Sequence, residues 1–259
     1  MITTTLQGRA GNQFYIISHM LAYAKKNNLE YYIPDVAYHC DGRKMYFPSM
    51  ANGPELPGFA EYHELTTHAT PKGDGTFTYN TPSYQDIPRM DNTKFIGYWQ
   101  SFEYFDSERD YILEKFNLPY QKKEGCVGLH FRRGDFLQLT DKHPEIPIEY
   151  YRKAIRYFAD KGYEDFIVFS DDMKWCEENL THLLPKDINL LFSNATSELD
   201  DLISLSGCEH QILCYSTFGF VAAYLNRNPN KQIIIPPKDY VFSGANANFI
   251  HSSFIQLDF

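Results

Sequence analysis

Between residues 121 and 240, short apolar runs alternate with segments of helical apolar spacing. This alternation constrains the fold of the 259-residue chain more than any other feature. The run at 126–131 is almost entirely apolar, as is typical of a strand buried on both faces. The sequence predicts further strands at 166–169, 188–192, 211–215 and 232–235, and helices at 149–161, 173–180, 197–206 and 217–226. Such alternation predicts a parallel sheet covered by helices on both faces.

The first part of the chain begins with the same pattern. A strand at 2–6 and a glycine turn at 8–11 precede a helix with Phe14, Ile17 and Leu21 on one face. Strands at 29–33 and 95–100 and a helix at 105–116 follow, with a proline-rich passage between them. We therefore expect an α/β protein of two Rossmann-like domains facing a cleft. The expected domains are 1–120 and 121–240, with a tail, 241–259, packed back on the N-terminal domain.

Composition narrows the possible partners. With 24 Lys+Arg against 33 Asp+Glu, the net charge of −9 argues against nucleic acid or an anionic membrane as the main partner. No apolar run is long enough to span a membrane, and no secretory signal is expected. The 5 cysteines show no C-x-x-C or metal-ligand spacing, so we expect free thiols in a reducing cytoplasm. Aromatic residues make up 16%, which suits either a packed core or a sugar-stacking surface.

The strongest candidate for a binding site is the sequence from His130 to Asp135, where a buried strand ends. Two adjacent arginines, Arg132 and Arg133, leave the strand onto a glycine turn. Arginine grips phosphate oxygens through a rigid, permanently charged fork, so this pair predicts an anionic ligand. The alternative is an ordinary structural pairing of one arginine with Asp135 or another carboxylate.

Other polar groups also follow predicted strands, but each is weak by itself. Gly8–Gln13 opens a helix without the spacing of a P-loop or a dinucleotide fingerprint. Ser216 and Thr217 begin another helix, where capping is the simpler interpretation. Capping also explains Asp171 or Asp172, and solvation explains Asp200, Asp201 and the loop residue His143.

Taken together, the motifs resemble one family. The sequences GRAGNQ at 8–13, GYWQSFEYF at 97–105, HFRRGD at 130–135 and FSDD at 169–172, with the stretch from Asp201 to Phe218, are similar to α-1,2-fucosyltransferases of glycosyltransferase family 11. The resemblance implies a GT-B fold and inverting transfer of L-fucose from GDP-fucose, with no metal or other cofactor. The expected acceptor is a galactoside-terminated glycan, at O2 of the terminal galactose, in an oligosaccharide or surface polysaccharide precursor.

The resemblance also implies roles for individual residues. Arg133 would bind the β-phosphate and Arg132 would support the loop or the fucose. Asn12 would reach the diphosphate or fucose from the opposite domain. The other implied donor-binding residues are Arg9, Gln13, His130, Ser216, Thr217 and Phe218, with Asp200 or Asp201 facing the guanine.

The catalytic base stays open among Asp135, His143 and Glu145. The chain departs from the family pattern at Tyr215, Gly219, Phe220 and Val221, which affects the expected acceptor more than the fold. Two alternatives remain: a transferase for another GDP-sugar, and a non-catalytic nucleotide-sugar or glycan-binding module. Peripheral membrane association stays possible, and the oligomeric state is not assigned. The residues expected on an acceptor-side surface are Tyr98, Trp99, Phe102 and Tyr104.

Overall fold

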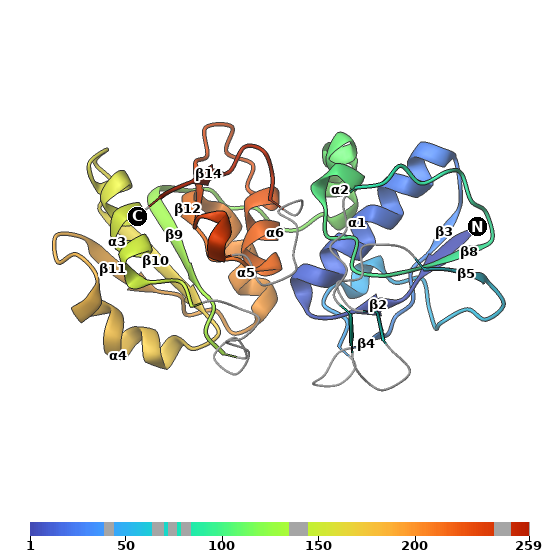
Figure 1. Cartoon of the computed structure of the whole chain (residues 1–259), viewed down its shortest axis with the longest axis horizontal. Coiled ribbons are helices and arrows are strands. Elements are labelled where there is room, and N and C mark those ends of the chain that lie inside the picture. Colours follow the sequence, from blue (N-terminus) through green and yellow to red (C-terminus); the bar gives the residue numbers. More distant parts are fainter. Residues whose placement is uncertain are drawn as a thin grey trace. The chain divides into compact units, whose positions relative to one another are not determined.

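The computed structural model describes residues 1–38, 44–63, 70–71, 77–78, 84–134, 145–240 and 250–258. These residues divide into two compact units (Figure 1). The first contains Met1–Leu118 and residues 250–251, and the second begins at Pro119 and includes residues 252–258. No helix among the described residues is long and apolar enough to cross a membrane.

The first unit is built on a four-stranded parallel sheet. Its strands, in sheet order, are β3 (Tyr31–Tyr32), β1 (Ile2–Thr4), β8 (Thr93–Ile96) and β5 (Ala60–His63). The predicted strand at 2–6 is interrupted at Thr5, because β2 (Leu6–Gln7) pairs instead with β4 (Ala37–Tyr38). A further antiparallel pair joins β6 (Thr70–Pro71) to β7 (Phe77–Thr78).

Helix α1 (Ala10–Asn27) packs the apolar face predicted from the sequence into the first unit. It ends where Asn28 adopts a left-handed conformation and its N–H turns back to the last carbonyls. Lys25 and Lys26 lie in its last turn, where positive charge is favourable. The helix predicted at 105–116 is shorter: two 3-10 turns, Phe102–Tyr104 and Asp106–Glu108, precede α2 (Arg109–Phe116).

The second unit has a six-stranded sheet in which every pairing is parallel. In chain order its strands are β9 (Lys123–Phe131), β10 (Asp165–Ser170), β11 (Asn189–Phe192), β12 (Cys208–Ile212), β13 (Ile233–Ile235) and β14 (Ile255–Gln256). Their order in the sheet is β11-β10-β9-β12-β13-β14. This is the 3-2-1-4-5-6 order of a doubly wound sheet, whose order reverses between β9 and β12.

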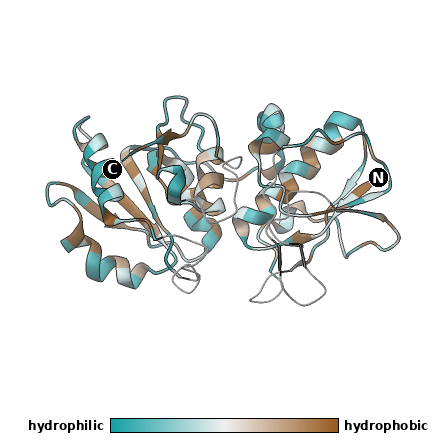
Figure 2. Cartoon of the chain, in the orientation of Figure 1, coloured by the Kyte–Doolittle hydropathy of each residue, from teal (hydrophilic) through white to brown (hydrophobic). Residues whose placement is uncertain are grey.

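Four helices connect these strands: α3 (Ile148–Ala159), α4 (Met173–Leu183), α5 (Glu198–Gly207) and α6 (Thr217–Leu225). Each coincides with a predicted helix within a few residues. Helices α3 and α4 carry hydrophobic and hydrophilic residues on opposite faces (Figure 2). Their apolar faces pack on β9 and β10 in a core that includes Phe158 of α3 and the strand residues Val127, Leu129, Phe166 and Val168.

The tail prediction is wrong for residues 252–258. Strand β14 pairs in parallel with β13, aligning Ile234 with Ile255, and so completes the sheet of the second unit. Of the described tail residues, only 250 and 251 stay with the first unit, where the His251 ring contacts Phe102 and its Nε2 lies 3.3 Å from Asp106 Oδ2. A two-residue strand carries no periodicity in the sequence, so its pairing could not be predicted from a local pattern.

Candidate functional site

The order of the second sheet reverses where the carboxyl ends of β9 and β12 lie side by side. Open α/β sheets bind ligands at such a position. Arg132 and Arg133 follow β9 directly, and Ser216 stands between β12 and α6. The fold thus brings together two predicted groups that lie more than eighty residues apart in the chain.

Both arginines are held by the carboxylates that follow β10. Arg132 Nη1 lies 2.9 Å from Asp171 Oδ2, and the backbone N–H of Arg133 donates to Asp171 Oδ1 at 2.9 Å. Arg133 Nε lies 3.5 Å from Asp172 Oδ2. The alternative interpretation, a structural pairing of an arginine with a carboxylate, therefore holds for Asp171 and Asp172. Asp135 lies outside the described residues. The two side chains remain 14% and 18% exposed, so the pairs fix the arginines without removing them from solvent.

The capping prediction for the carboxylates is confirmed at Asp172. Its Oδ1 accepts a hydrogen bond from the backbone N–H of Trp175 at 3.3 Å, at the start of α4. The Trp175 ring in turn stacks on Arg133, whose guanidinium carbon lies 3.4 Å from the ring centroid. Sequence reasoning missed Trp175, although its place three residues after a helix cap was a usable signal.

His130, the penultimate residue of β9, is a buried, neutral ring. Burial, with a smaller effect of the charge on Arg132, lowers its pKa to about 3. Its Nδ1 lies 3.3 Å from the Cys214 sulfur, and burial raises the pKa of that thiol to about 12. The ring also packs against Phe218, at 5.2 Å between centroids. A Cβ at Gly219 would lie 2.8 Å from His130 Nδ1, so this position has no room for a side chain.

Helix α6 begins beside this cluster. Ser216 occupies the cap position with extended backbone, but its side chain makes no capping hydrogen bond. Ser216 is thus the cap residue by position, but the predicted side-chain cap is not formed. The N–H groups of a first helical turn and the positive end of the helix dipole favour an anion. The two arginines follow β9 and the start of α6 follows β12, and these two strands are neighbours in the sheet.

The departures from the family pattern around α6 are packing residues. The Tyr215 hydroxyl donates to the Pro236 carbonyl at 2.7 Å, and Phe220 and Val221 are fully buried. They fill the interior of the second unit.

Asp200 and Asp201 lie in the first turn of α5. Asp200 Oδ2 accepts from the Ser197 hydroxyl at 2.7 Å, and Asp201 Oδ1 accepts from the Ser193 hydroxyl at 2.6 Å. Burial raises the pKa of Asp201. Both carboxylates have local partners, and a role in binding guanine stays a prediction.

In the first unit, β1 and β8 are neighbours at the centre of the sheet, and polar residues follow both. Gln100 Nε2 donates to Asn12 Oδ1 at 2.7 Å, which joins the loop after β8 to the start of α1. Gly8 makes this approach possible, because its φ is +73° and a Cβ there would lie 2.3 Å from Asn12 Nδ2. Arg9 is the N-cap residue of α1 and makes no side-chain cap bond.

The sequence predicts that Gln13 contacts the sugar nucleotide. This prediction is wrong, because the side-chain amide of Gln13 is buried and already bound to the backbone. Its amide is fully buried and bound to the backbone on both sides. Nε2 donates to the carbonyls of Gly8 at 2.9 Å and Lys44 at 2.8 Å, and Oε1 accepts from the N–H of Tyr46 at 2.9 Å. Gln13 therefore fixes the turn that presents Asn12.

The predicted acceptor-side aromatic surface is wrong for Trp99 and Phe102 and stays a prediction for Tyr98 and Tyr104. Trp99 is fully buried and Phe102 is 4% exposed, whereas Tyr98 and Tyr104 are partly exposed. Trp99 stacks on His19 at 4.1 Å between centroids, and burial lowers the pKa of His19 to about 3. Helix α1 therefore draws these aromatic residues into the core.

The base is not located. Asp135 and His143 lie outside the described residues, and Glu145 is exposed just before α3. Within the described ranges, no group of three or more His, Cys, Asp or Glu side chains could hold a metal ion.

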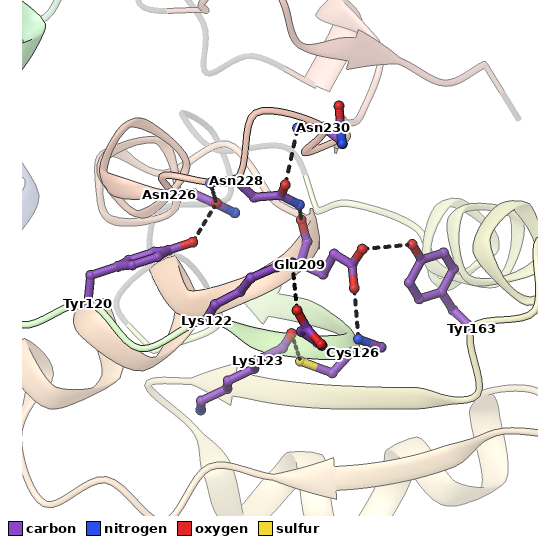
Figure 3. A network of polar contacts seen from close by, with 11 residues as sticks. Tyr120, Lys122, Lys123, Cys126, Tyr163, Glu209, Asn226, Asn228 and Asn230 are labelled. Carbon is purple, nitrogen blue, oxygen red and sulfur yellow. Dashed lines mark hydrogen bonds and ion pairs between the residues drawn. The ribbon is translucent and has the colours of Figure 1, made fainter.

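The Cys208-Glu209-His210 part of the family-like signature lies at the opposite, amino end of β12. Figure 3 shows Glu209 between Tyr163 and the start of β9. Its carboxylate accepts from the Gly125 N–H at 2.7 Å and from the Tyr163 hydroxyl at 3.2 Å. His210 Nε2 lies 2.7 Å from the same hydroxyl. These residues stabilise the amino end of the sheet and lie away from the arginines.

Comparison with known proteins matches residues 77–252 to the family model described as Glycosyl transferase family 11. The O-antigen biosynthesis glycosyltransferase WbnK of Escherichia coli is 33% identical over 171 residues, 58% of this chain and 56% of that protein. Galactoside alpha-(1,2)-fucosyltransferase 1 of Alouatta caraya is 26% identical over 246 residues, 84% of this chain and 63% of that protein. An alpha-1,2-colitosyltransferase of Escherichia coli is 27% identical, over 56% of this chain and 55% of that protein. The chain thus spans less than two thirds of the length of these relatives.

Among solved structures, POFUT1 in complex with GDP superposes with a TM-score of 0.51 at 11% identity, over 90% of this chain and 98% of that chain. POFUT1 in complex with GDP-fucose gives a TM-score of 0.50 at 12% identity, over 90% and 96%. These similarities, with the two α/β units and their parallel sheets, show a GT-B type fold.

Proposed function

This chain belongs to glycosyl transferase family 11, and from that premise we propose that it transfers L-fucose from GDP-fucose to a hydroxyl of a galactoside-terminated glycan. The observation that carries the proposal is the pair Arg132 and Arg133, beside the start of α6 at the reversal of the second sheet. A sugar nucleotide carries a diphosphate, and this is where the second unit gathers donors for an anion.

The proposed reaction is a single displacement with inversion. The acceptor oxygen forms a bond to the anomeric carbon of fucose while the bond from that carbon to the β-phosphate oxygen breaks. The hydroxyl proton passes to a base, and GDP leaves with the bonding electrons. Oxocarbenium character develops on the sugar and negative charge on the departing diphosphate.

Arg133 is proposed to bind that developing charge, with Arg132 supporting the loop. Donors held in place before the reaction stabilise charge without reorganising, and their ion pairs hold both arginines in place. The neutral ring of His130 would lie beside the nucleotide, and Ser216, Thr217 and the first turn of α6 would bind phosphate oxygens.

For the first unit, we propose a role in transfer for Asn12 and Arg9. Asn12 is oriented by Gln100, and Arg9 begins α1. The names of the Alouatta and Escherichia relatives support galactose O2 as the acceptor position and an O-antigen as an acceptor class.

A second candidate is transfer of a different sugar, and the similarity to an alpha-1,2-colitosyltransferase favours it. A non-catalytic module that binds nucleotide sugar or glycan is the remaining alternative. A cytoplasmic location stays a prediction, supported by the buried free thiols of Cys126, Cys176, Cys208 and Cys214.

The test is transfer with GDP-fucose, GDP-mannose and UDP-galactose as donors and a panel of galactosides as acceptors. Product mass, GDP release and the anomeric NMR signal would be measured. We expect GDP release coupled to a fucosylated product with an α linkage. Transfer from another donor alone would replace the proposal with the second candidate, and GDP binding without any product would leave a binding module.

A further inference from the structure

Trp175 faces Arg133, which the proposed function places on the β-phosphate. It lies in the first turn of α4, and its ring is 3.4 Å from the guanidinium carbon of Arg133. At this distance the planar guanidinium lies in contact with the aromatic face. The ring side of the guanidinium is thereby closed to other partners, and its N–H groups point outward in their own plane.

Asp172 holds both partners of this stack. One carboxylate oxygen accepts from the backbone N–H of Trp175 at 3.3 Å, and the other lies 3.5 Å from Arg133 Nε. Nε lies toward Asp172, and among the described residues the terminal nitrogens of Arg133 have no ion-pair partner. Arg133 is also anchored at its backbone, through the N–H bond to Asp171.

The contacts of Arg133 with Asp172 and with Trp175 affect the binding of a phosphate differently. A carboxylate beside an arginine orients it but also neutralises part of the positive potential that attracts a phosphate. An aromatic ring restricts the guanidinium and adds no negative charge. Holding a rotamer-rich side chain before the ligand arrives reduces the entropy lost on binding.

We propose that Trp175 is a positioning residue that keeps the Arg133 fork directed at the β-phosphate of the sugar nucleotide. The inference rests on the proposed function and adds a residue to which the sequence motifs assign no role. The competing explanation is packing alone, because Trp175 also contacts the hydrophobic core of the second unit. The two explanations differ in whether the effect is specific for the β-phosphate.

The experiment compares Trp175→Leu and Trp175→Phe with the wild type, using calorimetry with GDP and with GMP. We expect Trp175→Leu to raise the Kd for GDP about 5- to 10-fold and that for GMP less than about twofold, the size of a partly exposed cation–π contact. Trp175→Phe keeps a ring and should restore most of the affinity. The matched control is Tyr157→Leu, which removes the ring under Lys161 Nζ (3.7 Å) on α3 and should change neither Kd.

Two further measurements make the test independent of one variant. In an Arg133→Ala background, Trp175→Leu should weaken GDP binding no further. In the Trp99→Phe protein, Trp175 is the only tryptophan, and its emission should change on titration with GDP at the calorimetric Kd.

Equal losses for GMP and GDP, an unchanged GDP Kd in Trp175→Leu, or constant Trp175 emission would overturn the inference while leaving the proposed function intact. Wild-type protein that binds no GDP would overturn both.

Discussion

The two units place different chemistry at the centre of their parallel sheets. In the second unit, Arg132 and Arg133 follow the central strand and pair with Asp171 and Asp172. In the first unit, the neutral amides of Asn12 and Gln100 meet after the two central strands. The topology sets where a ligand can bind, and the residues that follow the strands set the charge of the ligand. We therefore expect the second unit to bind the anionic part of the ligand, whereas the first unit offers neutral amides, with Arg9 beside them at the start of α1.

The largest effect on this contrast is expected from Arg133→Ala. Loss of a preorganised donor to a leaving diphosphate should lower kcat/KM for GDP-fucose by about 100-fold or more, in steady-state assays of GDP release. Arg152→Ala is the matched control, because Arg152 forms an exposed ion pair with Glu149 on α3 and should leave transfer unchanged. Near-normal transfer by Arg133→Ala would contradict the proposal that the second unit binds the diphosphate through Arg133.

The first unit can be tested with two adjacent amides that have opposite roles. Gln13→Ala leaves buried backbone groups of Gly8, Lys44 and Tyr46 without partners, and should lower the free energy of unfolding by about 2 kcal/mol or more. Asn12→Ala should lower kcat about tenfold with a stability loss of about 1 kcal/mol. Urea unfolding and initial rates separate the two, and the reverse pattern would contradict the assignment.

Each unit buries a histidine whose pKa is lowered to about 3, His19 in the first and His130 in the second. Their folded pKa values of about 3 lie below the unfolded value of 6.5, so the unfolded chain binds protons first as the pH falls. Their contribution is complete above about pH 6.5 and is lost progressively toward pH 3. At pH 5.5 each histidine should lower the free energy of unfolding by about 1.4 kcal/mol relative to neutral pH.

His19→Phe removes the contribution of His19 to the loss of unfolding free energy at low pH. Denaturation curves at pH 7.5 and 5.5 should therefore differ less in the variant than in the wild type. An identical pH dependence in both proteins would show that His19 does not stay neutral.

The smallest effect is expected at the amino end of the second sheet. Glu209→Gln weakens acceptance from Gly125 and Tyr163, and should lower the free energy of unfolding by about 0.5–1 kcal/mol with GDP affinity unchanged. Thermal melts and GDP calorimetry on the same preparation measure both quantities. A weaker affinity for GDP would link this end of the sheet to the ligand site.

The second unit was predicted more completely than the first, for a physical reason. Strands β9, β12 and β13 are largely buried, and helices separate the strands β9 to β13 along the chain, so the local pattern records them. The predicted run 126–131 and β9 end at the same residue. In the first unit, β5 is four residues long and lies within a proline-rich passage. Its pairing with β8 is non-local, and no periodic signal precedes it.

The candidate site was predicted in part. Placing Arg132, Arg133 and Ser216 at strand ends needed only the order of elements. The role of Gln13 and the burial of Trp99 depend on which side chains surround them, and an isolated sequence does not contain that information. The stack of Trp175 on Arg133 joins two elements that become neighbours only when β9 pairs with β10.

Strand β14 covers an edge of the second sheet that would otherwise invite aggregation. Without Ile255 and Gln256, the all-isoleucine strand β13 would present unpaired N–H and C=O groups at the sheet edge, the kind of edge on which other chains aggregate. With β14 in place, the edge strand is two residues long and ends in an exposed glutamine. A stop codon before residue 252 is therefore expected to leave the second unit prone to aggregation as well as shorter.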